Sequence, residues 1–303
     1  MSRKPRKSRP DRSQHATSGK ESTDAPASDG GSQNVSDSHS ELRFSDLAGR
    51  DVVVSFDGGP DPFDDSGSEV VEADDEISFD QYFQAIRTGW VLYLENSTDL
   101  AILQAFARKL GHKRAIRALE RPLVEYVQNQ PATAQRHFHG LREANTEIRG
   151  IALFDRLELE LPDIAPIECL TWRRREIENY VCSRATLEAY AAGTAKDDSA
   201  GLLFAASEVG MRRNAMREAI AEVESALKAS GKPSPWCEDI KASEDFLDPV
   251  FASYFRKLNL PNPMANRNFH ELAEHVPETE IDPEICAKLD AIADVAEIAT
   301  PGG

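Results

Sequence analysis

Two acidic residues, four positions apart, follow the short apolar run WVLYL. Glu95 comes directly after this run, and Asp99 lies in the first turn of the amphipathic segment that follows it. A second apolar run, GIALF, also ends at an acid, Asp155. In an open parallel sheet, ligands bind beyond the carboxyl ends of the strands. We therefore expect these three carboxylates to crowd one edge of a sheet.

Carboxylates that are held close together repel each other unless a cation neutralises them. Hard oxygen ligands of this kind suit Mg²⁺ or Mn²⁺. Two such ions, about 3.5–4 Å apart, can clamp the attacking and leaving oxygens of a phosphodiester. The pattern thus predicts metal chemistry, with Glu95 as ligand and general base and with Asp99 and Asp155 as ligands. Each acid taken singly also fits a structural role, because helix starts attract acids through the helix dipole.

The elements that would position these acids alternate between apolar runs and amphipathic segments. The runs of strand length cover residues 90–94, 123–127, 150–154 and 167–172. After the first run, Leu103, Phe106 and Leu110 share one helical face, and Gly111 suits the end of that helix. Residues 131–144 form a further helical segment. Alternating strands and helices predict right-handed crossovers and a parallel sheet covered on both faces, which is an α/β fold.

Composition divides the chain into three parts. Residues 1–78 are rich in Ser, Asp, Gly and Pro and predict a disordered low-complexity tail. Its one apolar exception, DVVVSF at residues 51–56, has the length of a strand. Residues 79–192 form the predicted α/β domain. Residues 193–303 carry helical patterns and are expected to pack on that domain as a helical C-terminal region.

The bulk properties exclude several classes of protein. The net charge of −17 argues against a broad basic DNA-binding face, although a local basic groove stays compatible with it. The four cysteines have no paired spacing, which excludes a zinc knuckle or a disulfide framework. No run suits a membrane span or a signal peptide. We expect a cytoplasmic protein that has no P-loop ATPase of its own, because no GxxxxGK[ST] motif occurs.

The ordered set of motifs resembles a known family. The unit VLYLENSTDLAILQAFARKLG, the later IALFDRLELE, and the segments WRRREIENYV and IDPEICAKLDAIADVA are similar to a TOPRIM domain. More narrowly, they resemble the C-terminal half of overcoming-lysogenization-defect (OLD) nucleases and of AAA-type ATPase-associated TOPRIM proteins. The resemblance covers about residues 80–298. It implies a TOPRIM-like parallel sheet, Mg²⁺ or Mn²⁺ at the acids, and a nucleic-acid substrate, with DNA favoured over RNA. Glu178, within the ENY triplet, would support the metal, with Glu176 as its alternative.

The sequence departs from the TOPRIM pattern at two positions. Asn96 follows the glutamate where the family usually has glycine, and Leu157 replaces the second aspartate of the Asp-x-Asp motif. Glu158 or Glu160 would have to supply the missing ligand, and Glu158 is the first choice. A late basic residue often faces the scissile phosphate in such folds. Three candidates for that role remain open: Lys241, Lys257 and Arg267.

Two functions follow from this pattern. The first is a metal-dependent nucleic-acid phosphodiesterase or nicking endonuclease of the OLD type. The alternative is a catalytically inactive TOPRIM-fold scaffold or regulatory partner of a separately encoded ATPase. The retained acids favour the first function, whereas Leu157 and the acidic surface favour the second. A homo-oligomer is a further expected partnership. The arginines at 173–175 fit either a nucleic-acid backbone or ion pairs within the fold.

Overall fold

The computed structural model describes residues 40–45, 51–56, 77–158, 161, 166–198 and 202–299. The chain forms two units, residues 1–64 and 65–303. In the first unit, β1 (Ser40–Ser45) pairs antiparallel with β2 (Asp51–Phe56). Strand β2 is the apolar stretch DVVVSF, which lies within the segment that the composition predicts to be a disordered tail. The other residues before Ile77 lie outside the described ones, and the disorder predicted for residues 1–78 stays a prediction there.

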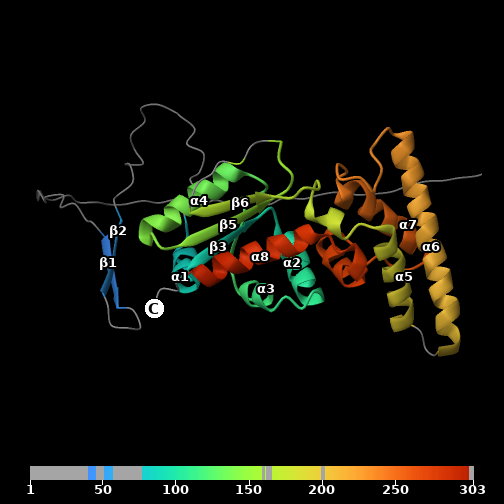
Figure 1. The fold of residues 1–303 in the computed structure, drawn as a ribbon, viewed down its shortest axis with the longest axis horizontal. Coiled ribbons are helices and arrows are strands. Elements are labelled where there is room, and N and C mark those ends of the chain that lie inside the picture. Colours follow the sequence, from blue (N-terminus) through green and yellow to red (C-terminus); the bar gives the residue numbers. More distant parts are fainter. Residues whose placement is uncertain are drawn as a thin grey trace, which may run out of the picture. The chain divides into compact units, whose positions relative to one another are not determined.

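The second unit is built on a four-stranded sheet in which every pair of neighbours is parallel (Figure 1). Its strands are β3 (Trp90–Leu94), β4 (Leu123–Tyr126), β5 (Arg149–Phe154) and β6 (Ile167–Thr171). They lie in the order β4-β3-β5-β6. The four apolar runs of the sequence are these four strands, to within a residue at each end. The predicted parallel α/β sheet is therefore confirmed.

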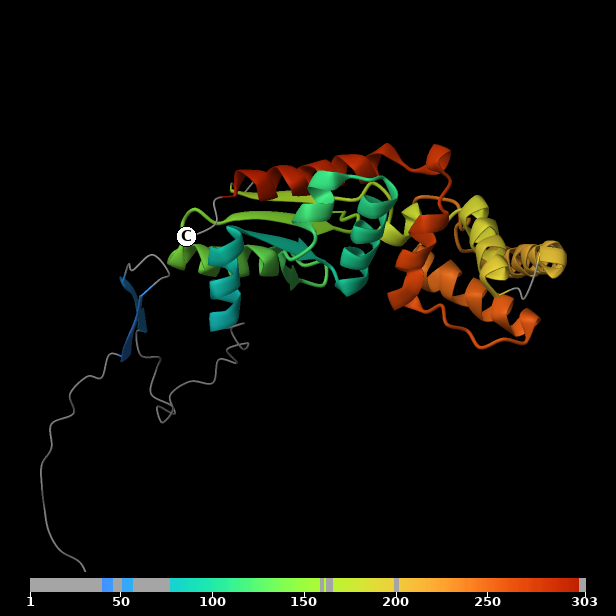
Figure 2. The same cartoon turned by 90° about the horizontal axis from the view of Figure 1, so that it is seen from below.

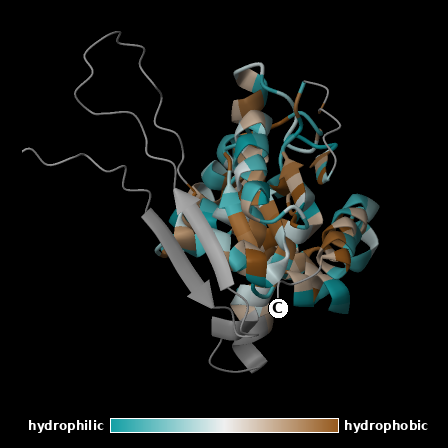
Figure 3. Cartoon of the chain, turned by 90° about the vertical axis from the view of Figure 1, so that its left-hand side faces the viewer, coloured by the Kyte–Doolittle hydropathy of each residue, from teal (hydrophilic) through white to brown (hydrophobic). Residues whose placement is uncertain are grey.

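Alternate side chains of the strands pack against helices on opposite faces of the sheet. The helices nearest in sequence are α1 (Phe79–Thr88), α2 (Ser97–Lys109), α3 (Lys113–Ala118) and α4 (Pro131–Ala144). Leu92 belongs to the apolar cluster that includes Phe106 of α2, whereas Tyr93 belongs to the one that includes Phe138 of α4. Figure 2 shows the helices on both sides of the sheet, and Figure 3 shows hydrophobic colour on the strands between them. Burial on both faces explains why the strands are apolar throughout.

Local signals set the ends of the first two helices. Ser78 and Gln81 form a capping box at the start of α1, which satisfies backbone N–H groups that the helix itself cannot bond. Gly89 ends α1 with a φ of 74°, and Gly111 follows α2 with a φ of 61°. Both values are left-handed, the region that glycine enters most readily. The predicted helix end at Gly111 is confirmed, while α3 was not predicted.

The C-terminal part is helical, as the sequence predicts. It contains α5 (Arg184–Asp198), α6 (Leu202–Ala229), the π-helical turn η2 (Ser243–Leu247), α7 (Asp248–Leu258), the 3₁₀ segments η3 (Asn266–His275) and η4 (Glu278–Glu280), and α8 (Pro283–Ile298). Helix α8 returns to the sheet, where its Leu289 shares a buried cluster with Ile151 of β5. One core therefore serves both the sheet and the helical part.

No helix among the described residues combines the length and the apolar character that crossing a membrane requires.

Candidate metal centre at the carboxyl edge of the sheet

The strand order creates a crevice between β3 and β5. From β3 the chain crosses to β4 on one side, and it then returns to β5 on the other side. Ligands of open α/β sheets bind at such a switch point, beyond the carboxyl ends of the strands. Glu95 follows β3 and Asp155 follows β5. Glu95 and Asp155, two of the three acids that the sequence singled out, therefore flank this crevice.

Five carboxylates gather at this edge: Glu95, Asp99, Asp155, Glu176 and Glu178. Four of them are buried, with exposed fractions of 3% for Asp99, 9% for Asp155, 3% for Glu176 and 4% for Glu178. Burial is the largest cause that raises the pKa of each of these four, and the charges of other members of the set raise it further. The predicted convergence of Glu95, Asp99 and Asp155 is thus present in the fold, with two further acids beside it.

Asp99 is held at the start of α2 by the turn that follows β3. The backbone N–H of Glu95 donates to Asp99 Oδ2 at 3.3 Å. Asn96 has an extended backbone conformation, and its side chain caps α2 by accepting from the Thr98 N–H at 2.7 Å. Burial, followed by the charge of Glu95, raises the pKa of Asp99 to about 7. Asp99 therefore holds a proton for much of the time near neutral pH.

Asp155 has a buried carboxylate oxygen that makes no hydrogen bond to the described residues. Its backbone N–H donates to the side chain of Asn129 at 2.8 Å, and Asn129 itself has a left-handed φ of 63°. The carboxylate atom Oδ1 is buried and has no hydrogen-bond partner in the described part of the chain. Burial, followed by contact with Glu95 and its charge, raises the pKa of Asp155 to about 10. A buried, unpartnered carboxylate oxygen is costly unless a proton or a cation reaches it.

Glu178 reaches the cluster from η1 (Ile177–Tyr180), a single 3₁₀ turn, and Glu176 is the N-cap residue of that turn. The backbone N–H of Ser243 donates to Glu176 Oε1 at 2.5 Å. The Thr98 hydroxyl donates to Glu178 Oε1 at 3.3 Å. Burial raises the pKa of Glu178 well above its ordinary value, and the charges of Glu176 and Asp99 add to that rise. Sequence reasoning favoured Glu178 over Glu176, whereas the fold buries both.

The loop after Asp155 places the other predicted ligands differently. Leu157 is half-buried and packs against the apolar cluster that contains Phe138. Glu158 is exposed and is absent from the charges that raise the pKa values of the described buried acids. Glu160 lies outside the described residues. Glu158 was predicted to supply the missing ligand. Among the described residues, Glu176 and not Glu158 lies beside Glu95, Asp99, Asp155 and Glu178.

The structure distinguishes the three basic candidates. Lys241 donates to Glu244 at 2.7 Å, which raises its pKa, and the nearby charges of Glu176 and Glu95 raise it further. Lys257 instead pairs with Glu222 at 3.3 Å. Arg267 bonds to its neighbour Asn268. Of the three, only Lys241 lies within electrostatic reach of the carboxylate cluster.

The arginines of the WRRRE segment serve the fold through ion pairs. Arg173 bonds to Asp282 at 2.6 Å, just before α8, and Arg174 approaches the same carboxylate at 3.6 Å. Arg174 also lies over the ring of Tyr180, at 5.1 Å from its centroid. These contacts tie the end of β6 to the start of α8. For these two arginines, the ion-pair interpretation fits better than contact with a nucleic-acid backbone.

As the side chains stand, no three His, Cys, Asp or Glu residues in the described ranges are arranged to hold one metal ion. The five acids are near enough for their charges to act on one another, but they do not surround a common point. The donor set is all oxygen, which suits Mg²⁺ or Mn²⁺ better than softer metals.

No protein-family model, curated protein sequence or solved structure matches the chain. The resemblance to TOPRIM domains therefore stays a prediction.

Proposed function

We propose that the chain is a divalent-metal-dependent phosphodiesterase that nicks or cleaves nucleic acid, probed most simply with DNA. The observation that carries this proposal is the buried, unpartnered Oδ1 of Asp155 within a cluster of four other carboxylates. The cluster lies beside the crevice where this kind of sheet binds ligands. A purely structural role does not explain why so many acids are buried together, because each one lowers the stability of the others' charged forms.

The residues divide into distinct roles under this proposal. Glu95, Asp99 and Asp155 would hold Mg²⁺ or Mn²⁺, with Glu176 and Glu178 supporting them. The ion would polarise the phosphodiester and lower the pKa of a bound water. Glu95 is the least buried of the five acids, so it is the best placed to accept a proton from that water. The ammonium group of Lys241 would attract and orient the substrate phosphate.

Protons and metal compete for the same oxygens in this site. Because burial and mutual repulsion raise the pKa values of Asp99 and Asp155, these acids retain protons at pH values where exposed carboxylates are ionised. An incoming ion must displace those protons, and it lets the carboxylates close around it. Metal binding should therefore strengthen as the pH rises from about 6 to about 8.

Cleavage of supercoiled plasmid DNA tests the proposal. With Mn²⁺ at about pH 8, the wild type should nick the plasmid, and EDTA should stop it. Glu95→Gln should lower the rate more than about 100-fold, since loss of an outer-shell partner alone costs about 10–100-fold in many metal sites. Glu158→Gln is the matched control, because Glu158 is an exposed acid close by, and it should leave the rate unchanged. Nicking that survives EDTA, or equal losses in both variants, would contradict the proposal.

A second candidate function is favoured by Leu157, whose side chain packs in an apolar cluster and supplies no ligand. Under this alternative, the fold binds a metal without cleaving DNA and acts as a scaffold or as the regulatory partner of a separately encoded ATPase. Metal binding by a wild type that never nicks DNA would select this alternative over the nuclease.

A further inference from the structure

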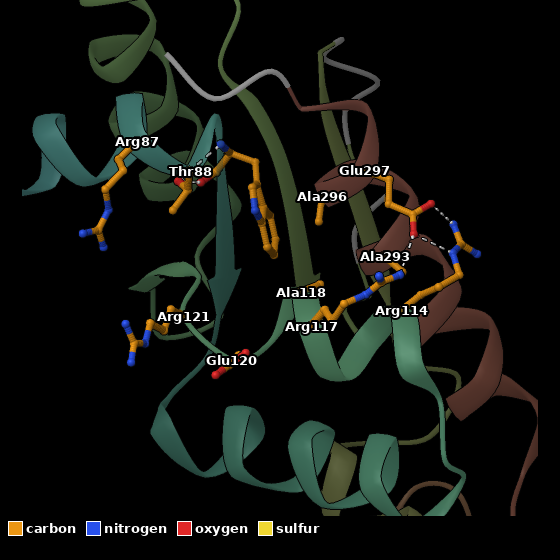
Figure 4. A pocket seen from close by; sticks show the side chains of 11 residues that line it. Arg87, Thr88, Arg114, Arg117, Ala118, Glu120, Arg121, Ala293, Ala296 and Glu297 are labelled. Atoms are coloured by element: carbon orange, nitrogen blue, oxygen red, sulfur yellow. Dashed lines mark hydrogen bonds and ion pairs between the residues drawn. The ribbon is translucent and has the colours of Figure 1, made fainter. Parts of the chain in front are cut away.

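An open pocket of about 660 Å³ lies at the opposite edge of the sheet, where the strands begin. Trp90, the first residue of β3, lines it, together with residues from the end of α1, from α3, from the loop before β4 and from the end of α8 (Figure 4). None of its lining residues belongs to the carboxylate cluster. The pocket is therefore independent of the proposed phosphodiesterase site.

Positive charge dominates this pocket although the whole chain is strongly acidic. Four arginines line it, with two glutamates. Arg114 is already occupied, because it bonds to Glu297 at 2.9 Å and also to Asp294. Arg87 and Arg121 are exposed, and their side chains make no hydrogen bond or ion pair with other described residues. In Figure 4 these two lie on one side of the pocket, across from the Arg114–Glu297 pair.

Helix ends explain only part of this charge. Arg87 and Arg117 lie in the last turns of α1 and α3, where a cation offsets the helix dipole. Arg121 lies beyond the end of α3, so no helix end accounts for it. Arg149 begins β5, pairs in register with Trp90 and is also exposed. The arginines therefore continue along the sheet edge beyond the helix ends.

The pocket also has an apolar part, which we call its floor. It consists of Trp90, a residue that is 4% exposed, and of three alanines, Ala118, Ala293 and Ala296, of which Ala293 is fully buried. An apolar surface of this kind suits a flat ring. Glu120 lines the pocket without an ion pair to another described residue, so its carboxylate can accept a hydrogen bond from a hydroxyl group.

We propose that this pocket binds a nucleotide. The base would lie on the alanine and Trp90 floor, the phosphates would bond to Arg87 and Arg121, and a ribose hydroxyl would donate to Glu120. Guanidinium groups suit phosphate because they donate two parallel hydrogen bonds. The pocket volume falls within the range of about 300–1,000 Å³ that small-molecule sites occupy. The nucleotide can be free or can be the phosphorylated end of a strand, because both present the same groups.

Isothermal titration of the full chain in EDTA tests this proposal without contribution from metal. The probes are ATP, ADP, AMP, inorganic pyrophosphate and a 5′-phosphorylated oligonucleotide. We expect at least one nucleotide probe to bind about tenfold or more tightly than pyrophosphate. The double variant Arg87→Ala/Arg121→Ala should weaken that binding at least about tenfold, since each lost bond to a charged group has about that effect. Both residues are exposed, and circular dichroism should show an unchanged fold.

The matched control is Arg108→Ala/Arg213→Ala, which removes two exposed arginines outside the pocket and changes the net charge equally. Its nucleotide affinity should equal that of the wild type. Tight binding of mononucleotides identifies a free nucleotide as the ligand, and a clear preference for the oligonucleotide identifies a strand end. The proposal is overturned if no probe binds at millimolar concentration, if pyrophosphate binds as tightly as the nucleotides, or if both double variants lose affinity alike.

Discussion

At the edge where β3 and β5 end, four carboxylates are buried and a fifth lies beside them, whereas at the edge where these strands begin, arginines stand exposed around an open pocket. The two edges belong to one sheet and are separated by the length of a strand. They differ in the sign of their charge and, more importantly, in the solvent exposure of the charged groups. Because the carboxylates are buried and the arginines are exposed, electrostatic repulsion destabilises the folded protein mainly at the acidic edge.

Burial makes the acidic edge costly. Desolvation disfavours each carboxylate anion, and the neighbouring anions disfavour it again, so the pKa values of Asp99 and Asp155 rise. Exposed arginines retain their hydration, and solvent screens their repulsion. The acidic edge should therefore gain stability when its charge is neutralised, whereas the arginine edge should be nearly indifferent to the loss of a charge.

The largest expected effect on stability is that of Asp155→Asn, which removes the titrating group with little change in size. Because the pKa of Asp155 is raised from 3.8 to about 10, the folded state keeps a proton that the unfolded state releases. Stability contributed by that proton is complete below about pH 4 and is lost as the pH rises toward 10. The variant should show a flatter pH profile and should exceed the metal-free wild type by about 1–3 kcal/mol near pH 9.

Urea unfolding in EDTA between about pH 5 and pH 9 measures this difference. Glu158→Gln serves as the control on the same loop and should retain the slope of the wild type. Parallel pH profiles for the wild type and Asp155→Asn would show that the carboxyl edge carries no such strain.

A smaller effect is expected at the arginine edge. Arg87→Ala/Arg121→Ala should change the free energy of unfolding by less than about 0.5 kcal/mol per site, because neither side chain bonds to another described residue. The same urea titrations measure it. A loss above about 1 kcal/mol per site would mean that these arginines hold the fold together, and the contrast between the two edges would then disappear.

Much of the acidic edge could be predicted from the sequence because it depends on local patterns. Apolar runs fixed the strands, and acids directly after two parallel strands had to meet at one edge. The choice of Lys241 and the burial of Glu176 could not be predicted in this way. They depend on contacts such as the bond between Ser243 and Glu176, which joins residues 67 positions apart.

The arginine edge could not be predicted from the sequence, because it too depends on contacts between residues that are far apart in the chain. Arg114 and Glu297 are 183 positions apart, and only the return of α8 to the sheet brings them to one pocket. The pocket exists because α3, an unpredicted short helix, lies beside α8. Neither the spacing of the arginines nor their local sequence distinguishes them from ordinary surface residues.

The claim that the carboxyl edge binds a divalent ion is tested most directly by thermal unfolding with Mn²⁺ and Mg²⁺. An ion that binds only the folded state stabilises it by about 2.7 kcal/mol at a hundredfold excess over Kd. The Tm of the wild type should therefore rise with metal, and more at about pH 8 than at about pH 6, whereas Asp155→Asn should show no rise. The claim would be contradicted if neither ion changed the Tm of the wild type at any pH. It would also be contradicted if the ions raised the Tm of Asp155→Asn as much as that of the wild type.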